Sequence, residues 1–365
     1  MKKSSESQLL QTGTSSCWRT GHIIETFSGT PREMGREWGR TYRHLIQALF
    51  WECMPFHHPH PIEKRLDELA EKAIDKFRRW TPDYLAEMEA AAPECGLTLE
   101  QMALRADGFV YQRKNMYQKA EGCFQIGVNM PGIGPIVGSI MDSARVVFAW
   151  WRLRPAKGYA HLALTIPGTA CSDRGMNEHG LVVSESSTPT PGVDFWDDLL
   201  LHTLGTRLVL EQCRTVKEAV ALMTSLPVSH AYIFADAEGG LLGLQTSPVG
   251  HKVYELENGA VVLANHIRDG ELLRKHIQHG YDPLFRNAGS ELRVKIALEL
   301  VEAHKGNRDF DFIRSVLSSH LGHPDSICRD GNAASFIAMP QADAKHIWIA
   351  ERFPCASPFL KYSVV

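Results

Sequence analysis

The spacing of apolar positions changes once along the chain, near residue 122. Before this point, apolar side chains recur every three to four residues, which predicts helices. Gly35 and Gly39 lie four residues apart on one helix face, and since glycine lowers helix propensity, they predict a close crossing with a second helix. The expected helices are 31–50, 62–80, 83–92 and one that begins at Thr98.

After residue 122 the apolar runs become short and are separated by turns rich in glycine and proline, which predicts strands. Longer helical patterns interrupt them at 195–224, 290–304 and 308–318. Strands joined as hairpins, with the helices kept apart from them, favour antiparallel sheets covered by helices, an α+β layered fold. The expected strands are 136–141, 146–153, 160–166, 180–184, 230–235, 241–246, 251–255, 260–264, 334–339 and 345–350, the last two joined by a turn at 341–343.

Composition excludes several classes of protein. The 365 residues are 44% hydrophobic and 22% charged, with a formal net charge of −3. This balance suits a globular protein and gives no electrostatic reason to expect nucleic acid or an anionic membrane as a partner. We expect a disordered tail over the first 16 residues, and the absence of an apolar segment there predicts a cytoplasmic protein without a signal peptide.

Eight cysteines are scattered along the chain without a CxxC pair. This pattern is typical of reduced thiols in the cytoplasm. No zinc-type spacing occurs, so no metal site is expected. The cluster at 57–60, His-His-Pro-His, could bind a metal, but the prolines around it favour a solvated loop between helices.

The tripeptide Glu121-Gly122-Cys123 lies where the helical pattern ends. Cleavage of the Gly122–Cys123 bond would place a nucleophilic thiol and a free α-amine on one residue, which is sufficient for amide cleavage without a distant histidine. The alternative is an ordinary buried cysteine, because free cysteines are often buried.

Three further residues have the chemistry that such a nucleophile needs. Asp142 lies nineteen residues after Cys123, a separation that lets a hairpin bring its carboxylate to the α-amine. Asn265 ends an apolar strand, where its side-chain NH₂ suits a tetrahedral oxyanion. Arg329 has a planar fork that can hold Asp142 or the substrate. The alternatives are a turn carboxylate, a local turn at the asparagine and a surface arginine paired with Asp330.

Several motifs in a consistent order resemble peptidase family C45, the acyl-coenzyme A:6-aminopenicillanic acid acyltransferase group of the N-terminal-nucleophile (Ntn) hydrolases. The resemblance covers nearly everything after residue 25, and Cys123 lies where the family has its nucleophile. The blocks are Ser28–Gly39 (SGTPREMGREWG), Gly134–Asp142 (GPIVGSIMD), Gly175–Leu181 (GMNEHGL), Ala264–His266 (ANH) and Ser326–Arg329 (SICR).

The resemblance implies a four-layer αββα Ntn-hydrolase sandwich with a helical N-terminal portion. Residues 1–122 would form a leader that is cleaved autocatalytically and retained as a small subunit, and residues 123–365 would form the core. The family's catalytic roles would fall on Cys123, Asp142, Asn265 and Arg329. Homo-oligomerisation is left open by the sequence.

Two positions depart from the family pattern. Phe124 stands where the family usually has Thr or Ser, and Ser139 stands where relatives have Arg or Gln. We interpret both, with Ser186 and Ser187, as candidates to line the substrate site.

The sequence therefore predicts an enzyme that hydrolyses a linear N-acyl amide, a small molecule, through an acyl-thioester on Cys123. A second hypothesis is an acyltransferase that moves an acyl group from a thioester donor to an amine. A third is an unprocessed binding protein of the same fold, favoured by Phe124 and Ser139. No cofactor is expected, and acyl-CoA would enter only as a substrate of a transferase.

Overall fold

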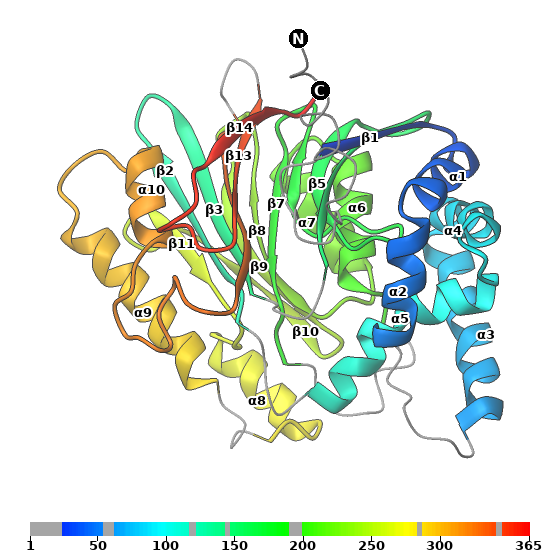
Figure 1. Cartoon of the computed structure of the whole chain (residues 1–365). Helices are drawn as coiled ribbons and strands as arrows, with labels where there is room; N and C mark the ends of the chain where they lie inside the picture. The colour runs from blue at the N-terminus through cyan, green and yellow to red at the C-terminus, as the bar shows by residue number, and fades with distance from the viewer. Residues whose placement is uncertain are drawn as a thin grey trace, which may run out of the picture.

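The computed structural model describes residues 24–53, 62–116, 122–142, 147–189, 199–282, 287–340 and 345–365. The predicted N-terminal tail, the histidine cluster at 57–60, the turn at 341–343 and residues 195–198 of the expected helix lie outside these ranges. Two facing sheets form the centre of the molecule, and helices cover both of their outer faces (Figure 1). The predicted α+β class and its αββα arrangement are confirmed.

The larger sheet has eight strands, and neighbouring strands are antiparallel except β1 and β4, which are parallel. Its hairpins follow the chain order, as the alternating short apolar runs predict. In spatial order the strands are β1 (Ile24–Gly29), β4 (Ala149–Pro155), β5 (His161–Thr165), β6 (Gly175–Asn177), β7 (Val182–Ser186), β8 (His230–Ala235), β9 (Leu241–Ser247) and β10 (Gly250–Tyr254).

The smaller sheet has six antiparallel strands and holds the segment that starts at Cys123. β2 lies between β11 and β3, so this segment is in the interior of the sheet. In spatial order the strands are β11 (Ala260–Leu263), β2 (Phe124–Met130), β3 (Gly134–Asp142), β12 (Asn332–Ala338), β13 (His346–Glu351) and β14 (Leu360–Ser363).

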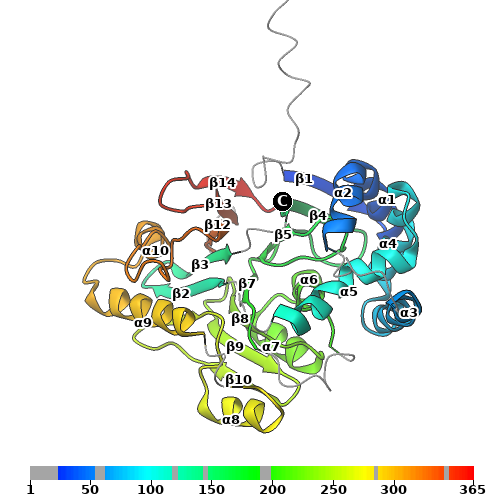
Figure 2. The same ribbon diagram turned by 60° about the horizontal axis from the view of Figure 1, so that its bottom comes forward.

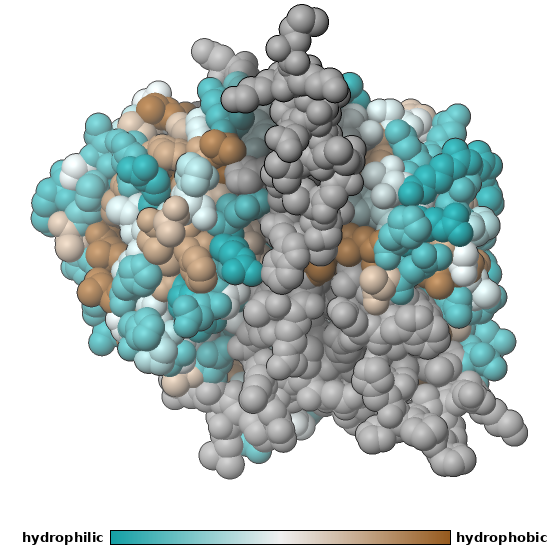
Figure 3. All heavy atoms as spheres, viewed as in Figure 1, coloured by the Kyte–Doolittle hydropathy of each residue, from teal (hydrophilic) through white to brown (hydrophobic). Residues whose placement is uncertain are grey.

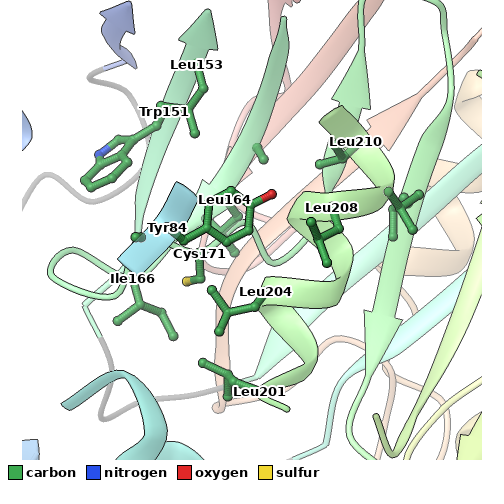
Figure 4. Close-up of a cluster of buried hydrophobic side chains, with 14 of the residues drawn as sticks. Tyr84, Trp151, Leu153, Leu164, Ile166, Cys171, Leu201, Leu204, Leu208 and Leu210 are labelled. Atoms are coloured by element: carbon green, nitrogen blue, oxygen red, sulfur yellow. The ribbon is translucent and has the colours of Figure 1, made fainter. Parts of the chain in front are cut away.

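Different helices cover the two sheets. α9 (Ala288–Ala303) and α10 (Phe310–Leu317) pack on the outer face of the smaller sheet, where Phe124 and Ile126 meet Val294 and Ile313. α6 (His202–Gln212) and α7 (Val216–Ser225) cover the larger sheet. Figure 4 shows leucines of α6 gathered with Leu164 of β5 and with Tyr84. α8 (Gly270–Gln278) lies beside β10 (Figure 2).

The N-terminal segment packs against one end of the larger sheet as a group of five helices. They are α1 (Pro31–Thr41), α2 (Arg43–Cys53), α3 (Ile62–Trp80), α4 (Pro82–Cys95) and α5 (Leu99–Met116). α1 and α4 cross closely: a Cβ on Gly35 would lie 2.1 Å from the carbonyl oxygen of Glu87, and one on Gly39 would lie 3.0 Å from that of Ala91. The close crossing predicted from the two glycines is confirmed.

Some elements are absent from the sequence prediction. β1 precedes the first expected helix, β6 has three residues, β14 is an edge strand, and α8 is short. Each of these elements is too short to show a clear hydrophobic periodicity in the sequence. Each forms because it pairs or packs with a neighbouring element. The helical pattern expected at 195–224, in two runs that divide after Cys213, forms two helices: Cys213 is extended, and Thr215 caps α7 with Glu218.

A buried ion pair joins the N-terminal segment to the core. Arg207 of α6 donates to both carboxylate oxygens of Glu87 on α4, with Nη2–Oε1 at 2.9 Å, and its Nε donates to Glu211. Both side chains of the Arg207–Glu87 pair are 1% exposed. Burial raises the pKa of Glu87, and the Arg207 guanidinium opposes this shift. Since an isolated buried charge is costly, this contact fixes α4 against α6.

The described part of the surface carries hydrophilic and hydrophobic residues intermixed on the face seen in Figure 3. Only a few large apolar side chains are exposed among the residues described, Leu321 and Val365 being the most exposed of them. Among the helices of the described ranges, none combines the length and apolarity needed to cross a bilayer.

Glu87→Gln is expected to lower the free energy of unfolding by about 3 kcal/mol, because it removes one of the two carboxylates that compensate the buried Arg207 guanidinium and leaves only Glu211. Glu89→Gln, on the same helix, is the matched control: Glu89 pairs with Arg32 on the surface, and its loss should cost about 1 kcal/mol or less. Urea unfolding followed by circular dichroism measures both, and equal losses would contradict the assigned role of the buried pair.

Candidate active site

Strand register brings the predicted nucleophile and aspartate together. β2 and β3 pair Phe124 with Ile140 and Gln125 with Ser139. One residue further on, Cys123 lies beside Met141, with the two sulfur atoms 3.5 Å apart. The Cys123 side chain is nearly buried, at 5% exposure.

Asp142 is held by three donors. Arg329 donates from Nε and Nη2 to Oδ2, at 2.9 and 2.7 Å, and Asn332 of β12 donates to Oδ1. Nη2 of Arg329 also donates to the carbonyl oxygen of Gly122, at 3.1 Å. Three of the predicted residues therefore meet around the peptide unit between Gly122 and Cys123. We call Asp142, Arg329 and Asn332 the carboxylate clamp.

The ionisation of the cysteine and the aspartate is set mainly by burial. Burial raises the pKa of the Cys123 thiol to about 11, and the Arg174 guanidinium opposes the shift. Burial also raises the pKa of Asp142, opposed first by Arg329 and then by Asn332. In the uncut chain the thiol is therefore protonated at neutral pH, and it must give up its proton as it attacks a carbonyl.

Arg174, which the sequence did not single out, lies between the two sheets beside the thiol. Its Nη2 lies 3.8 Å from Sγ of Cys123, and its Nη1 donates to Oγ of Ser139 at 2.7 Å. It also pairs with Asp173 and with Glu185 of β7. A fixed positive charge at this point stabilises a thiolate on Cys123 relative to the thiol.

A second buried group lies behind Arg174. Glu185 pairs with His202 Nε2 at 3.2 Å and with His230, and the two imidazoles stack with ring centroids 3.6 Å apart. Burial opposes ionisation of Glu185, but the two histidines hold the pKa of its carboxyl well below its usual range.

These three residues have ligand atoms within 4.8 Å of one another, as a metal site would need. The guanidinium of Arg174 already neutralises this carboxylate, so the arrangement fits an ion-pair network better than a cation site.

Asn265 lies on the other side of the cysteine segment. Its Nδ2 donates to Ser187, to the carbonyl oxygen at 2.9 Å and to Oγ at 3.1 Å, and its Oδ1 accepts from Arg293 Nη2 at 3.1 Å. Arg293 is 1% exposed, and its Nε and Nη1 have no hydrogen-bond partner among the described residues. Burial lowers the pKa of Arg293 to about 10.

Gly122 lies in contact with two guanidinium groups. A Cβ at this position would lie 2.0 Å from Nη2 of Arg329 and 2.4 Å from Nη2 of Arg293. Both arginines are anchored, one by Asp142 and the other by Asn265. Only glycine leaves room for both donors at the candidate scissile bond.

The four residues predicted to line a substrate site have different positions. Phe124 packs in the apolar layer between the smaller sheet and α9 and α10, so its location does not support a lining role. Ser139 is fully buried under Arg174, and Ser186 is also fully buried. Ser187 is partly exposed and accepts from Asn265.

Six residues were missed by sequence reasoning: Arg174, Glu185, His202, His230, Arg293 and Asn332. Two had a signal: Arg174 immediately precedes the Gly175–Leu181 block, and Glu185 is a charge inside an otherwise buried strand. A charged residue in such a strand predicts a buried partner. The two histidines and Arg293 reach the site only through packing between elements.

The two facing sheets, covered by helices and with a cysteine directly before a central strand, form the αββα arrangement that the family resemblance implies. Residues 138–292 match the model of the family described as acyl-coenzyme A:6-aminopenicillanic acid acyl-transferase. The family resemblance drawn from the sequence is therefore confirmed over this region, which is less than half of the chain. It includes Asp142 and Asn265, but neither Cys123 nor Arg329.

The chain is also similar to solved structures. An N-acylethanolamine-hydrolyzing acid amidase ortholog from Caenorhabditis elegans is 18% identical, covering 65% of this chain and 100% of that one, with a TM-score of 0.47. Penicillin V acylase from Agrobacterium tumefaciens is 15% identical, with 63% and 83% coverage and a TM-score of 0.41. A variant of conjugated bile acid hydrolase from Clostridium perfringens is 10% identical, with 66% and 96% coverage and a TM-score of 0.39. All three similarities are weak, with TM-scores below 0.5. No curated protein matches the chain.

Proposed function

We propose that the chain cleaves itself between Gly122 and Cys123 and then hydrolyses a linear N-acyl amide with Cys123 as nucleophile. The hydrogen bond from Arg329 Nη2 to the carbonyl oxygen of Gly122, at 3.1 Å, carries this proposal. A donor on this oxygen stabilises the negative charge that develops there when the carbonyl is attacked.

In the self-cleavage step, Sγ of Cys123 adds to the carbonyl carbon of Gly122. The thiol proton passes to the departing amide nitrogen, the C–N bond breaks, and a thioester forms between Gly122 and Sγ. Water then hydrolyses this thioester and leaves a carboxylate on Gly122 and a free α-amine and thiol on Cys123. Arg329 donates to the oxygen on which the negative charge develops, and the Arg293 guanidinium lies beside Cα of the same glycine.

In the mature protein the α-amine of Cys123 serves as the base. Its unperturbed pKa is ~7.7–8.0, close to neutral pH. The backbone position of Cys123 beside the carboxylate clamp lets Asp142 orient the ammonium form, while Arg174 stabilises the thiolate from the opposite side. The amine takes the thiol proton, Sγ attacks the substrate carbonyl, and the proton returns to the leaving amine.

Asn265 and Arg293 have a supporting role. Arg293 anchors Oδ1 of Asn265, and its buried Nε and Nη1 have no hydrogen-bond partner within the part of the chain that the structure describes. Unsatisfied buried donors are costly, so an oxyanion beside them is stabilised. The NH₂ of Asn265 donates to Ser187 in this structure. To donate to a substrate oxygen, it would have to give up a hydrogen bond to Ser187.

An acyltransferase is the second candidate, and the description of the matching family favours it. The chemistry is shared up to the acyl-thioester on Cys123. An amine in place of water would then accept the acyl group, and an acyl-CoA would serve as donor in place of the amide. No cofactor takes part in either case.

Cys123→Ala is expected to abolish both self-cleavage and activity, because it removes the nucleophilic thiol next to the candidate bond. Intact-mass spectrometry should show two fragments that divide at Gly122/Cys123 for the parent chain and one full-length chain for the variant. Cys171→Ala is the matched control. This cysteine is also buried, and it accepts hydrogen bonds from Thr165 on its carbonyl oxygen and from Thr169 on its sulfur. A parent chain that remains uncut in all conditions would overturn the proposed mechanism and favour the unprocessed binding protein.

Hydrolysis predicts that an N-acyl anilide gives the free acid as the only acyl product, with or without added amine. Chromatography of the products, with Cys123→Ala for background, measures this directly. A new amide that grows with amine concentration would establish the acyltransferase instead. The two outcomes are distinct because they differ in what attacks the acyl-thioester.

Arg174→Met is expected to raise the pKa of the Cys123 thiol and to lower kcat/KM, by about tenfold for each pKa unit. The pH dependence of Cys123 alkylation, followed by peptide mass spectrometry, should move to higher pH. Arg174→Lys should restore part of the effect because it keeps the charge. Arg154→Met on the exposed end of β4 is the control. Reduced activity with an unchanged alkylation profile would mean that Arg174 acts only on the fold.

A further inference from the structure

A second group of reactive side chains lies outside the candidate active site. His320 and Cys328 come from the segment between α10 and β12, and Cys355 comes from the turn between β13 and β14. One ligand atom from each lies within 4.8 Å of the others. The sequence predicts no metal site, because these residues have no metal-ligand spacing and only the fold brings them together.

The distance between the two sulfur atoms is informative. Sγ of Cys328 lies 3.4 Å from Sγ of Cys355. A disulfide would need about 2.05 Å. Two thiolates on one tetrahedral zinc, each about 2.3 Å from the metal, lie about 3.8 Å apart. The contact is a thiol–thiol hydrogen bond from Cys328 to Cys355, so no disulfide is closed, and the separation is near that of two zinc-bound thiolates. The nearby imidazole of His320 has no role in a disulfide.

The backbone on both sides of this group is fixed. The N–H of Cys328 donates to the carbonyl oxygen of Ser319, and the hydroxyl of Ser326 donates to the carbonyl oxygen of Cys328. The N–H groups of Ala356 and Ser357 both donate to the carbonyl oxygen of Phe353. Cys328 is buried, while His320 and Cys355 are exposed, so the donor atoms are held in place and remain open to an ion from solvent.

We propose that His320, Cys328 and Cys355 bind a zinc ion. Two thiolates and one imidazole are ligands that suit zinc, and three protein ligands leave the fourth position to water. Binding releases the thiol protons of both cysteines to solvent. The site would join the 320–328 segment to the β13–β14 turn, directly beside Arg329 of the carboxylate clamp. It requires neither self-cleavage nor catalysis.

The test measures zinc in untagged full-length protein that has been reduced, supplied with zinc and dialysed. The parent chain should retain one equivalent more than Cys355→Ser, by elemental mass spectrometry. Cobalt should give a thiolate charge-transfer band in the parent that is lost in Cys355→Ser. His320→Ala should bind about tenfold more weakly or worse, since one of three ligands is removed.

Two control variants should retain the full zinc content. Ser357→Ala alters the same turn without removing a ligand, and His251→Ala removes an exposed histidine from β10. Any binding at Glu185, His202 and His230, at Cys123 or in the 57–60 segment is common to all variants and cancels in the difference. Thermal unfolding confirms that each variant is folded.

Equal zinc content in the parent and in folded Cys355→Ser would overturn the proposal. So would a Cys328–Cys355 disulfide, seen as a loss of 2 Da that reductant reverses, if the reduced protein then binds no zinc. Because the readout is metal content, a failure here leaves the proposed function intact, and a failure of self-cleavage leaves this site intact.

Discussion

The ion pair between Asp142 and Arg329 connects the parts on which the candidate site depends. Asp142 ends β3, Arg329 precedes β12, and the same guanidinium reaches the carbonyl oxygen of Gly122 before β2. The Asp142 side chain is 2% exposed, so removal of either charge would leave the other poorly compensated. One interaction therefore fixes three chain segments and places a donor at the bond before Cys123.

The neighbouring charges follow from the same constraint of burial. Two sheets facing each other exclude water from the space between them, and a charge placed there needs a partner. Arg174 forms ion pairs with Asp173 and Glu185, and Glu185 also pairs with His202 and His230. The thiol of Cys123 lies at the edge of this network, next to its positive end. The sheets thus supply an electrostatic environment for the cysteine as well as its position.

The sequence predicted most of the fold because amphipathic helices and hairpins leave local periodic patterns. It missed β1 and β6, whose structure is set by partner strands. Cys123, Asp142 and Arg329 were predicted to meet, and they do, because hairpin register and motif order constrain them. Arg174, His202, His230 and Arg293 were not predicted, since contacts across two layers leave no spacing in the sequence. Phe124 was assigned to the site because it follows Cys123 and departs from the family pattern there, although successive residues of a strand face opposite sides.

The N-terminal segment is joined to the core by the peptide bond before Cys123 and, independently, by non-covalent packing. β1 pairs along its length with β4, and Glu87 of α4 is buried against Arg207 of α6. A cut after Gly122 removes neither contact. It does release the backbone at Cys123, so that an α-amine can turn toward Asp142 while the surrounding charges stay in place. The same packing that holds the segment on the core therefore lets one peptide bond be lost without rearranging the site.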